Sequence, residues 1–586
     1  MKTDIFLAAA LLLAVSCQHP EPVITLEDNG DFQSFVVTNP QKYLLLPVQE
    51  NKRAVQVRLN TGNEDTDTWM DVSLAVDDVD YYVPFALGGG KVATVDVKNL
   101  PADAAAWNLV ESSDEFDTAN REYYRPAYHF TPTYGWMNDP NGMTYTNGEY
   151  HLFFQYNPYG SKWGNMHWGH AVSKDLVHWN QLDPAIVRDN YGHIFSGSSY
   201  IARLPEELKG TDPFLADVLL PGNGTAGDFI ASYYTTHNDR NPRSLVEQQS
   251  FAISTDGGRT YRKFGAPVLK SDGRKDFRDP KLFWNAQRGE WGMIVSADNE
   301  MQFYGSKNLR DWSYVSAFGD GYGVQPRQFE CPDFFNLPVE GEDADKWVMI
   351  VNVNPGSWFG GSASQYFTGS FDGTDFVCDN PKETVKWIDW GKDHYAAVTF
   401  SCEPEGRVIA MPWMSNWQYA NNLPTQQYRS QMGMARELFA YRSGEDVYVG
   451  QRPVKEMLGI LGKSDAKLTD RCVVDLDIAD GASFTISNSD GEKVVISCNS
   501  GKVYMDRRES GIIPANTFAC ETWTPVAQLC GEKESYHLQL WFDRCSIEMF
   551  VDGGKASMTN LVYPRTPYDR ISGEGISNVE YKSINI

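Results

Sequence analysis

The chain has 586 residues, of which 42% are hydrophobic and 13% aromatic, and it carries a formal net charge of −26 at pH 7. This length exceeds that of one ordinary domain, and the apolar content is sufficient for packed cores, so the composition excludes a disordered protein. The negative charge argues against binding to nucleic acid or to an anionic membrane surface, because it repels phosphate groups. Neutral ligands remain open, and the aromatic side chains suit both the apolar faces of sugars and an ordinary all-β core.

The N-terminal residues resemble an export signal. An apolar run from Ile5 to Val15 follows Lys2 and is too short to span a bilayer. It leads into Leu-Ala-Val-Ser-Cys, which resembles the cleavage box of bacterial lipoproteins, in which Cys17 would be lipidated and become the new N-terminus. We therefore expect residues 1–17 to be a lipoprotein signal. The protein would be exported, facing the periplasm or the surface of a bacterium, and would contact the membrane only through the lipid anchor. An ordinary secretory signal is the alternative.

The other eight cysteines are widely spread and include no CxxC pair. This spacing argues against a disulfide scaffold and against a structural zinc site. We expect most of these cysteines to be buried thiols, and we expect neither a metal site nor a cofactor.

Residues 18–122 are expected to form a small module that resembles a β-sandwich. Short alternating runs such as RAVQVRLN and KVATVDVKNL are rich in β-branched residues and are separated by Gly, Asn and Asp clusters. The pattern does not distinguish a glycan-binding module from a spacer.

A diverged internal repeat runs through the middle of the chain. Its four copies contain Ser173, Ser254, Ser306 and Ser370, and each has an apolar strand, the serine, a polar turn and an aromatic residue at the start of the next strand. Such a unit is a hairpin of two strands. Four hairpins with other strands between them predict a β-propeller of four-stranded blades over residues 123–438. One blade without a clear copy would make five, and a long β-sandwich is the alternative.

A second β-sandwich is expected over residues 439–586. This region contains alternating strands broken by Asp-Gly and Asn-Ser-Gly turns, as in SFTISNSDGEKVVISCNSGKVYM. The predicted fold class is therefore all-β.

Three acidic residues stand close to prolines and aromatic residues. Asp139 lies in WMNDPNG, Asp279 in FRDPKLFW and Glu330 in FECPDFF. Asp-Pro followed by Asn-Gly is typical of a tight turn. Because each acid is near a repeat, each is expected to begin an innermost strand that faces the central channel. For any one acid alone, a turn cap or a solvated edge is an equally good interpretation.

Three carboxylates around one channel would be costly for structure alone, because like charges near each other resist ionisation together. The repulsion raises the pKa of at least one carboxyl. It thereby yields the mixture of ionised and protonated acids that glycoside cleavage requires.

These three motifs, in this order, resemble glycoside hydrolase family 32, which comprises the invertases, inulinases and levanases. Further matches are FFQYNP, WGNMHWGHAVS, FSGS and MPWMSNWQY. The resemblance is dense from about Tyr128 to Leu438, looser toward the C-terminus, and absent from the first 120 or so residues. It implies a five-bladed β-propeller followed by a C-terminal β-sandwich, here preceded by the N-terminal module. It also implies retaining hydrolysis of terminal β-fructofuranosyl linkages in levan- or inulin-type fructans and fructo-oligosaccharides, and in sucrose.

The resemblance also implies roles for the acids. Asp139 resembles the nucleophile, Glu330 the acid/base and Asp279 the stabiliser of the transition state. From its neighbours along the chain, Asp139 is expected to stay ionised. Asp333 and the surrounding phenylalanines are expected to raise the pKa of Glu330, and Arg278 is expected to keep Asp279 charged.

Other matched positions are expected to form the fructose pocket, with amides and hydroxyls that bind the sugar hydroxyls and indoles that cover its apolar side. These residues are Asn138, Gln155, Trp163, Phe195, Ser196, Arg278, and Trp413 or Trp417.

Three alternatives remain at this stage. A fructosyltransferase would use the same residues with a sugar as acceptor in place of water. An arabinose-cleaving propeller hydrolase also uses three acids but lacks the Asn-Asp-Pro-Asn-Gly motif. A glycan-binding lipoprotein without activity is expected to have lost one acid. Whether cleavage is exo or endo also stays open, and we expect exo cleavage if the segment Leu215–Phe229 covers the channel mouth.

Overall fold

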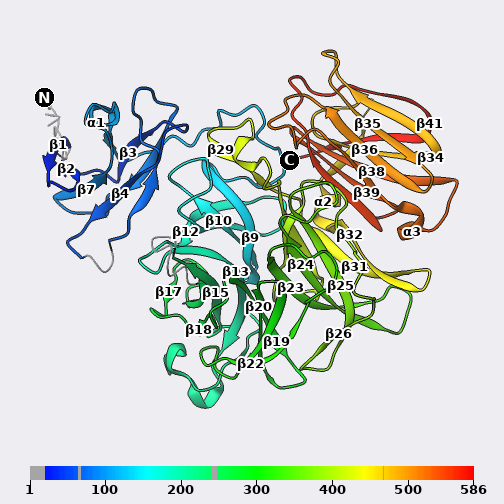
Figure 1. The fold of residues 1–586 in the computed structure, drawn as a ribbon, viewed down its shortest axis with the longest axis horizontal. Coiled ribbons are helices and arrows are strands. Elements are labelled where there is room, and N and C mark those ends of the chain that lie inside the picture. Colours follow the sequence, from blue (N-terminus) through cyan, green and yellow to red (C-terminus); the bar gives the residue numbers. More distant parts are fainter. Residues whose placement is uncertain (1–19, 64–66, 239–246, 466) are drawn as a thin grey trace, which may run out of the picture. The chain divides into compact units, whose positions relative to one another are not determined.

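The computed structural model describes residues 20–63, 67–238, 247–465 and 467–586. The predicted signal segment and its Cys17 lie outside these residues. The chain divides into two compact units, residues 1–117 and 118–586, which are described one at a time (Figure 1). Within the described residues, none of the helices is both long and apolar enough to cross a membrane.

The first unit is a β module that ends close to the predicted limit at residue 122. Its described strands form two sheets, of order β1-β2-β7-β4-β5 and β6-β3-β8. Alternate side chains along the strands, among them Phe35, Leu46 and Val57, are fully buried, because successive residues of a strand point to opposite faces. The elements are β1 (Val23–Asp28), β2 (Gln33–Thr38), β3 (Tyr43–Val48), β4 (Val55–Asn60), β5 (Met70–Val72), β6 (Tyr81–Ala86), β7 (Val92–Lys98), α1 (Ala106–Leu109) and β8 (Glu111–Ser113).

The second unit begins with sheets that follow one another along the chain. Among the described residues, this region forms five sheets of four to six strands each. The first sheet contains β9 (Gly135–Thr146), β10 (Glu149–Asn157), β11 (His167–Ser173), β12 (Asn180–Ile186) and, from far along the chain, β29 (Tyr428–Arg429). The second contains β13 (His193–Arg203), β14 (Leu220–Pro221), β15 (Phe229–His237), β16 (Glu247–Ser254), β17 (Arg262–Lys263) and β18 (Leu269–Lys270).

The other three sheets are simpler. The third contains β19 (Phe277–Asn285), β20 (Glu290–Ala297), β21 (Glu300–Ser306) and β22 (Ser313–Phe318). The fourth contains β23 (Phe329–Pro338), β24 (Asp345–Val353), β25 (Ala363–Phe371) and β26 (Phe376–Cys378). The fifth contains β27 (Tyr395–Thr399), β28 (Ile409–Met414), β30 (Gln431–Met432), β31 (Arg436–Ser443) and β32 (Asp446–Pro453). Short 3-10 turns are η1 (Glu206–Leu208), η2 (Pro213–Leu215) and η3 (Ala420–Asn422).

The first strand of each sheet lies at the centre of a closed ring. β9 contacts β13, β13 contacts β19, β19 contacts β23, β23 contacts β27, and β27 returns to β9. β29 also pairs in parallel with β9, with Tyr428 opposite Gly135, and so ties the end of the ring to its beginning. The described chain therefore forms a five-bladed β-propeller, as predicted (Figure 1).

The predicted repeat corresponds to the hairpin between the third and fourth strands of a blade. Ser173, Ser254 and Ser306 end β11, β16 and β21, and Ser370 lies near the end of β25. The fifth blade has the same feature, because Ser443 ends β31 just before a Gly-Glu-Asp turn.

The predicted end of the propeller at residue 438 falls inside β31. β31 pairs with β28 and with β32, so the fifth blade continues to Pro453. Alternating apolar residues look alike in the outer strands of a blade and in a sandwich, which explains the early boundary.

The C-terminal strands form a second layered structure. Their sheet has the order β37-β36-β35-β34-β38-β39-β40, and β41 pairs with both β33 and β34. The long strand β34 pairs with β38 over Cys472–Ala479 and with β35 over Ser483–Ser487, so it passes from one layer to the other, as in a sandwich. The elements are α2 (Lys455–Gly459), β33 (Leu461–Asp465), β34 (Cys472–Ser487), β35 (Lys493–Asn499), β36 (Lys502–Glu509), β37 (Glu521–Thr524), α3 (Val526–Cys530), β38 (Ser535–Asp543), β39 (Ser546–Val551), β40 (Ala556–Leu561) and β41 (Arg570–Ile584).

A buried network of ion pairs joins the propeller to the C-terminal sheet. His129 lies between two carboxylates, with Nδ1 2.9 Å from Asp543 and Nε2 2.7 Å from Glu548. The Arg436 guanidinium then bridges Glu548, at 2.5 Å, and Asp389, at 2.9 Å. The side chains of all five residues are almost fully buried.

Candidate active site

Each innermost strand of the propeller carries a β-bulge within its first few residues. The five bulges lie between Met137 and Pro140, Ile194 and Gly197, Arg278 and Lys281, Glu330 and Asp333, and Tyr395 and Val398. A bulge breaks the pairing ladder, bends the strand and changes the direction of its side chains. The three predicted acids, Asp139, Asp279 and Glu330, all lie at these bulges.

The bulges also explain the prolines beside the acids. Pro280 and Pro332 lie within their bulges and Pro140 borders one, and a strand tolerates a residue that lacks an N–H donor at such positions. The tight turn predicted at Asp139 is therefore wrong, since the whole motif lies within β9. Gly142 has a φ of +58°, and a Cβ atom there would lie 2.5 Å from the Trp168 ring, so close packing and backbone conformation both require glycine.

A pocket of about 390 Å³ lies at this end of the ring. All three acids line it, and its volume is that of an ordinary small-molecule site. The predicted binding residues that line it are Asn138, Gln155, Trp163, Phe195, Ser196, Arg278 and Trp417.

Trp413 does not line this pocket. It is fully buried and packs against Trp136, Tyr395 and Trp417, with ring centroids 6.2, 6.3 and 4.8 Å away. Trp413 therefore supports the pocket wall from behind, whereas Trp417 forms part of the wall itself.

Only one oxygen of the Asp139 carboxylate has a hydrogen-bond partner among the described residues. Ser196 Oγ donates a hydrogen bond of 2.8 Å to Oδ2, and the Cys331 thiol lies 3.5 Å from the same atom. Oδ1 is buried and has no hydrogen-bond partner among the described residues, and the same holds for the pocket amide nitrogen of Gln155. Burial raises the pKa of Asp139, and the nearby Glu330 raises it further. The neighbours along the chain gave no sign of this, because Glu330 comes from another blade.

Asp279 is held in a strained backbone conformation. Its φ is +63°, and that of Cys331 is +42°, a region that residues other than glycine seldom adopt. The backbone N–H of Cys331 donates a 2.8 Å hydrogen bond to Asp279 Oδ2, and Thr235 Oγ1 accepts one of 2.9 Å from the Asp279 N–H. Cys331 thus holds the carboxylate from one neighbouring blade, and Thr235 holds the Asp279 backbone from the other.

Burial raises the pKa of Asp279 to about 7, although Arg278 acts in the opposite direction. Arg278 was expected to keep this carboxyl ionised, but burial outweighs it, and the guanidinium also pairs with other acids. It lies 2.9 Å from Glu247, 2.9 Å from Asp276 and 3.2 Å from Glu330.

Glu330 accepts hydrogen bonds from two sides. Arg278 Nη2 donates to one oxygen at 3.2 Å, and the Tyr395 hydroxyl donates to the other. Burial raises the pKa of Tyr395 well above its ordinary value, so this hydroxyl remains a donor. The neighbouring Asp333 carboxylate lies 2.9 Å from Lys281 Nζ and accepts a hydrogen bond from the Thr399 hydroxyl.

Four residues of this site were not predicted from the sequence, namely Tyr395 and the pocket-lining Glu247, His237 and Asp276. Tyr395 begins β27 and contacts Glu330, as described above. Glu247 begins β16 and accepts hydrogen bonds from His237, at 2.9 Å, and from the Phe277 N–H, at 2.8 Å, besides its pair with Arg278. Burial acts to raise the pKa of Glu247, but Arg278 and His237 outweigh it and hold that pKa at about 2.

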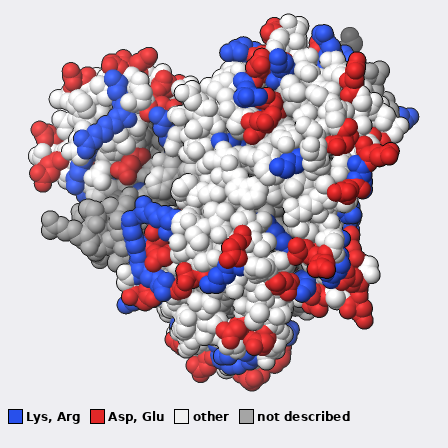
Figure 2. All heavy atoms as spheres, turned by 45° about the vertical axis from the view of Figure 1, so that its right-hand side comes forward, with Lys and Arg blue, Asp and Glu red and all other residues white. Residues whose placement is uncertain are grey.

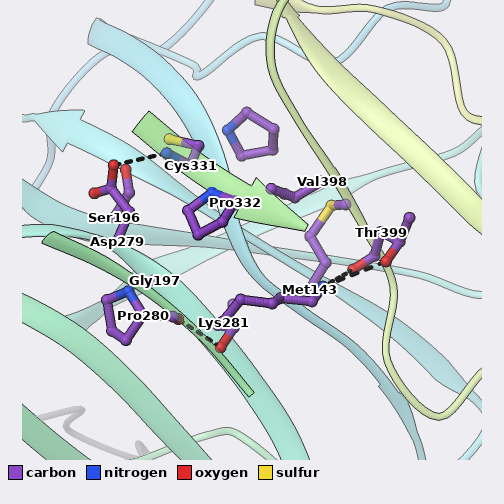
Figure 3. Close-up of a pocket in the computed structure, with 13 residues that line it drawn as sticks. Met143, Ser196, Gly197, Asp279, Pro280, Lys281, Cys331, Pro332, Val398 and Thr399 are labelled. Atoms are coloured by element: carbon purple, nitrogen blue, oxygen red, sulfur yellow. Dashed lines mark hydrogen bonds between the residues drawn. The ribbon is translucent and has the colours of Figure 1, made fainter. Parts of the chain in front are cut away.

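The propeller axis is packed behind the acids. A small cavity there is lined by residues of all five innermost strands, and its volume of about 10 Å³ is close to that of one water molecule. Figure 3 shows this cavity and the hydrogen bond between Cys331 and Asp279 at its edge. The site is thus a pocket at one end of the ring and does not continue as an open channel.

The segment Leu215–Phe229 does not cover the pocket. Within it, the Leu219 carbonyl accepts a 2.8 Å hydrogen bond from Trp291, and the Leu219 N–H donates one of 2.9 Å to Lys307. Trp291 pairs with Trp284, near the end of β19 that is farther from Asp279. The segment therefore lies at the opposite end of the blade, and the hypothesis that it closes the pocket is wrong.

The charge in the pocket favours neutral or positively charged ligands. Five acids line it, namely Asp139, Glu247, Asp276, Asp279 and Glu330, together with one arginine. Elsewhere on the surface, acidic and basic side chains are interspersed over the face seen in Figure 2. Excess negative charge in the pocket suits a hydroxyl-rich substrate that develops positive charge during reaction.

The described residues contain no clustered side chains that could bind a metal ion. Their His, Cys, Asp and Glu side chains form no group of three or more that could hold one. The eight cysteines in this part of the chain are free, and five of them are buried.

Comparison with known families agrees with this site. Residues 129–453 match the model of the glycosyl hydrolases family 32 N-terminal domain, and residues 445–586 match that of the family 32 C terminal domain. The chain belongs to glycosyl hydrolase family 32. It is therefore a glycoside hydrolase, and the family predicted from its motifs is confirmed. Residues 30–128 match a domain of unknown function, DUF4980.

Individual relatives match most of this chain. The chain is 41% identical to a levanase of Bacillus subtilis strain 168 over 480 residues, which are 76% of this chain and 68% of the relative. It is 33% identical to an extracellular exo-inulinase of Aspergillus niger over 484 residues, 75% of this chain and 90% of the relative. The crystal structure of exo-inulinase from Aspergillus awamori superimposes with a TM-score of 0.70 at 30% identity, over 80% of this chain and 99% of that one.

Proposed function

We propose that this enzyme hydrolyses terminal β-fructofuranosyl linkages of fructans and of sucrose, with retention of configuration. The observation that carries the proposal is the meeting of Asp139, Asp279 and Glu330, from three different blades, on one pocket. The relatives whose names include levanase and exo-inulinase support the substrate class.

In the first step, the Asp139 carboxylate would attack the anomeric carbon of the terminal fructosyl unit. Its Oδ1 is the carboxylate oxygen left without a protein partner and so is available for this bond. Glu330 would donate its proton to the glycosidic oxygen as the carbon–oxygen bond breaks. The products of this step are a fructosyl-enzyme ester and the shortened saccharide.

In the second step, the ionised Glu330 would take a proton from water, and the water oxygen would attack the same carbon. The ester bond breaks, fructose leaves, and Asp139 regains its charge. Two displacements at one carbon restore the original configuration. Tyr395 and Arg278 donate hydrogen bonds to Glu330, and they would hold its carboxylate in position through both proton transfers.

Asp279 would bind fructose hydroxyls and stabilise the transition state. With its pKa near 7, the carboxyl can both donate and accept hydrogen bonds under mildly acidic conditions. The half-exposed Trp163, which stacks on His193 at 5.7 Å, and the wall residue Trp417 would cover the apolar side of the sugar.

Glu247 would act through Arg278, and Glu247→Gln tests this role. The substitution removes the charge that holds the guanidinium, while Asp276 and Glu330 still attract it. We expect Arg278 to shift toward Glu330 and kcat/KM for sucrose to fall by about 10- to 100-fold, as small displacements in a site commonly cause. The matched control is Glu149→Gln, since Glu149 pairs with Arg259 near the surface, away from the pocket residues. Equal kcat/KM values in both variants would contradict the role.

Transfer of fructose to another sugar is not favoured as the main activity. The matched relatives carry hydrolase names, levanase and exo-inulinase. The match to family 32 also argues against an arabinose-cleaving propeller hydrolase.

Product analysis on sucrose, inulin and levan tests the activity and its exo character. We expect free fructose as the first product from every substrate that is cleaved, and strong resistance of a fructan whose fructosyl end is chemically blocked. Early ladders of oligosaccharides, or rapid cleavage of the blocked chain, would indicate endo cleavage. Products longer than the substrate at high sucrose would indicate transfer.

We further propose export of the enzyme and attachment through a lipid on Cys17. The apolar run and the cysteine box of residues 1–17 support this location, and the Aspergillus niger relative is named extracellular. An anchored enzyme outside the cell would meet polysaccharides that cannot enter it.

A further inference from the structure

A second pocket, of about 470 Å³, lies within the second unit where the propeller meets the C-terminal sheets. It is separate from the site of the three acids, with which it shares no lining residue. Aromatic residues dominate its wall. The main ones are Trp358, Trp387, Trp390 and Tyr448 from the propeller, and Trp523, beside Lys502, from the C-terminal sheets.

The tryptophans form one connected group of rings. The Trp523 ring lies 5.6 Å from that of Trp358 and 5.8 Å from that of Trp390, with interplanar angles of 34° and 33°. Trp358 is 50% exposed although it belongs to this group. A large indole face left open to solvent beside a pocket is a common feature of sites for ligands with an apolar face.

The pocket also contains polar groups without a dominant charge. Trp387 is 4% exposed, and its indole N–H has no hydrogen-bond partner among the described residues, so a ligand oxygen would satisfy it. Lys502 Nζ lies 4.0 Å from the centroid of the Trp523 ring. The Lys386 ammonium already donates to the Val447 carbonyl at 2.9 Å. Indole faces with scattered donors suit a neutral, hydroxyl-bearing saccharide better than an ion.

The loop between β24 and β25 lines the second pocket and contacts the wall of the first. It carries Trp358 into the second pocket, and its Ser362 hydroxyl accepts a 3.3 Å hydrogen bond from the backbone N–H of Trp417, which lines the first. Lys392 also fixes the loop by donating to the Phe359 carbonyl at 2.8 Å. A polymer bound at Trp358 would therefore be held on the same molecule that processes its end.

We propose that this tryptophan pocket is an ancillary binding site for a β-fructan chain. It would retain the polysaccharide while single units are removed at the pocket of Asp139. The identity of the polysaccharide rests on the proposed function, whereas the existence of a saccharide site rests on the pocket itself.

The first test compares short and long substrates. Trp358→Ala should leave kcat/KM for sucrose unchanged, because sucrose needs only the pocket of the acids. The KM for levan or inulin should rise about tenfold, the effect typical of truncating a central tryptophan of a binding site. Tyr314→Ala is the matched control, since Tyr314 is an exposed aromatic residue of the third blade, 58% accessible. An unchanged KM for both polymers in Trp358→Ala would overturn the proposal.

The second test measures binding without hydrolysis. The full-length Asp139→Asn enzyme should be retarded in gels that contain levan or inulin, but not in gels with dextran, and adding Trp358→Ala should strongly reduce the retardation, leaving only binding of chain ends at the pocket of the acids. Trp358→Phe, which keeps an aromatic ring, should restore part of it. Equal retardation with and without Trp358, or retardation by dextran, would overturn the proposal. A wild-type enzyme that cleaves neither sucrose nor fructan would instead refute the proposed function, and the gel test would still decide the binding site.

Discussion

Replacing Asp139 by asparagine is expected to lower kcat/KM for sucrose and inulin by about 10⁴-fold or more, because the amide cannot form the fructosyl ester. The substitution keeps the size of the side chain, and Ser196 can still donate to the remaining carbonyl oxygen. Loss of activity would therefore arise from chemistry and not from a damaged pocket. Initial rates of fructose release measure the effect directly.

Glu330→Gln serves as the comparison within the same site. Loss of general acid/base catalysis is expected to cost about 10²- to 10⁴-fold, so this variant should keep more activity than Asp139→Asn. The matched control is Asp183→Asn, since Asp183 is an exposed carboxylate of β12 in the same blade as Asp139. More than a few per cent of wild-type activity in Asp139→Asn would exclude a nucleophilic role for this residue.

The largest loss of stability is expected from Glu548→Gln. Glu548 is fully buried between His129 and Arg436. Without its negative charge, the positive charges of these two residues would be only partly neutralised in the interior. Breaking a buried ion pair in this way costs about 3–5 kcal/mol in the free energy of unfolding. Denaturant and thermal unfolding measure the loss. Glu342→Gln, at the exposed pair with Arg442, is the control and should leave the unfolding midpoint unchanged.

The same network predicts the sign of a pH effect. Burial lowers the pKa of His129, but Glu548 and Asp543 outweigh it and raise that pKa to about 9, above the ordinary value of 6.5. The folded state therefore binds the proton more tightly than the unfolded state does. The resulting stability is fully present below about pH 6.5 and is lost as the pH rises through about 9. In Glu548→Gln this alkaline loss should be smaller, and equal slopes of melting temperature against pH in both proteins would contradict the assignment.

Sequence patterns were sufficient for the parts of this enzyme that depend on short segments. The hairpins at Ser173, Ser254, Ser306 and Ser370 are complete within a few residues each, so they predicted the blades. The motifs of the acids could likewise be found, because each includes its own proline and aromatic neighbours and together they match one family.

Contacts between blades could not be predicted in this way. Tyr395 and Glu330 are 65 positions apart, and Arg278 and Glu247 are 31 apart, so no local pattern connects them. The partners of charged groups are hidden for the same reason. Asp333 follows Glu330 closely along the chain but pairs with Lys281 from another blade, and Arg278 is adjacent to Asp279 yet pairs with Glu247 and Glu330.

The bulges place the three acids near the start of innermost strands, where the strands meet the connections between them. The pocket is therefore built from two kinds of segment, strands and connections. Pairing within the blades and contacts around the ring hold the scaffold together, whereas Trp163, Asp276 and Trp417 reach the pocket from connections outside the strands. Such connections tolerate insertions and exchanges far better than strands do. Changes in these connections can therefore alter which fructan is accepted, while the three carboxylates stay where the bulges hold them.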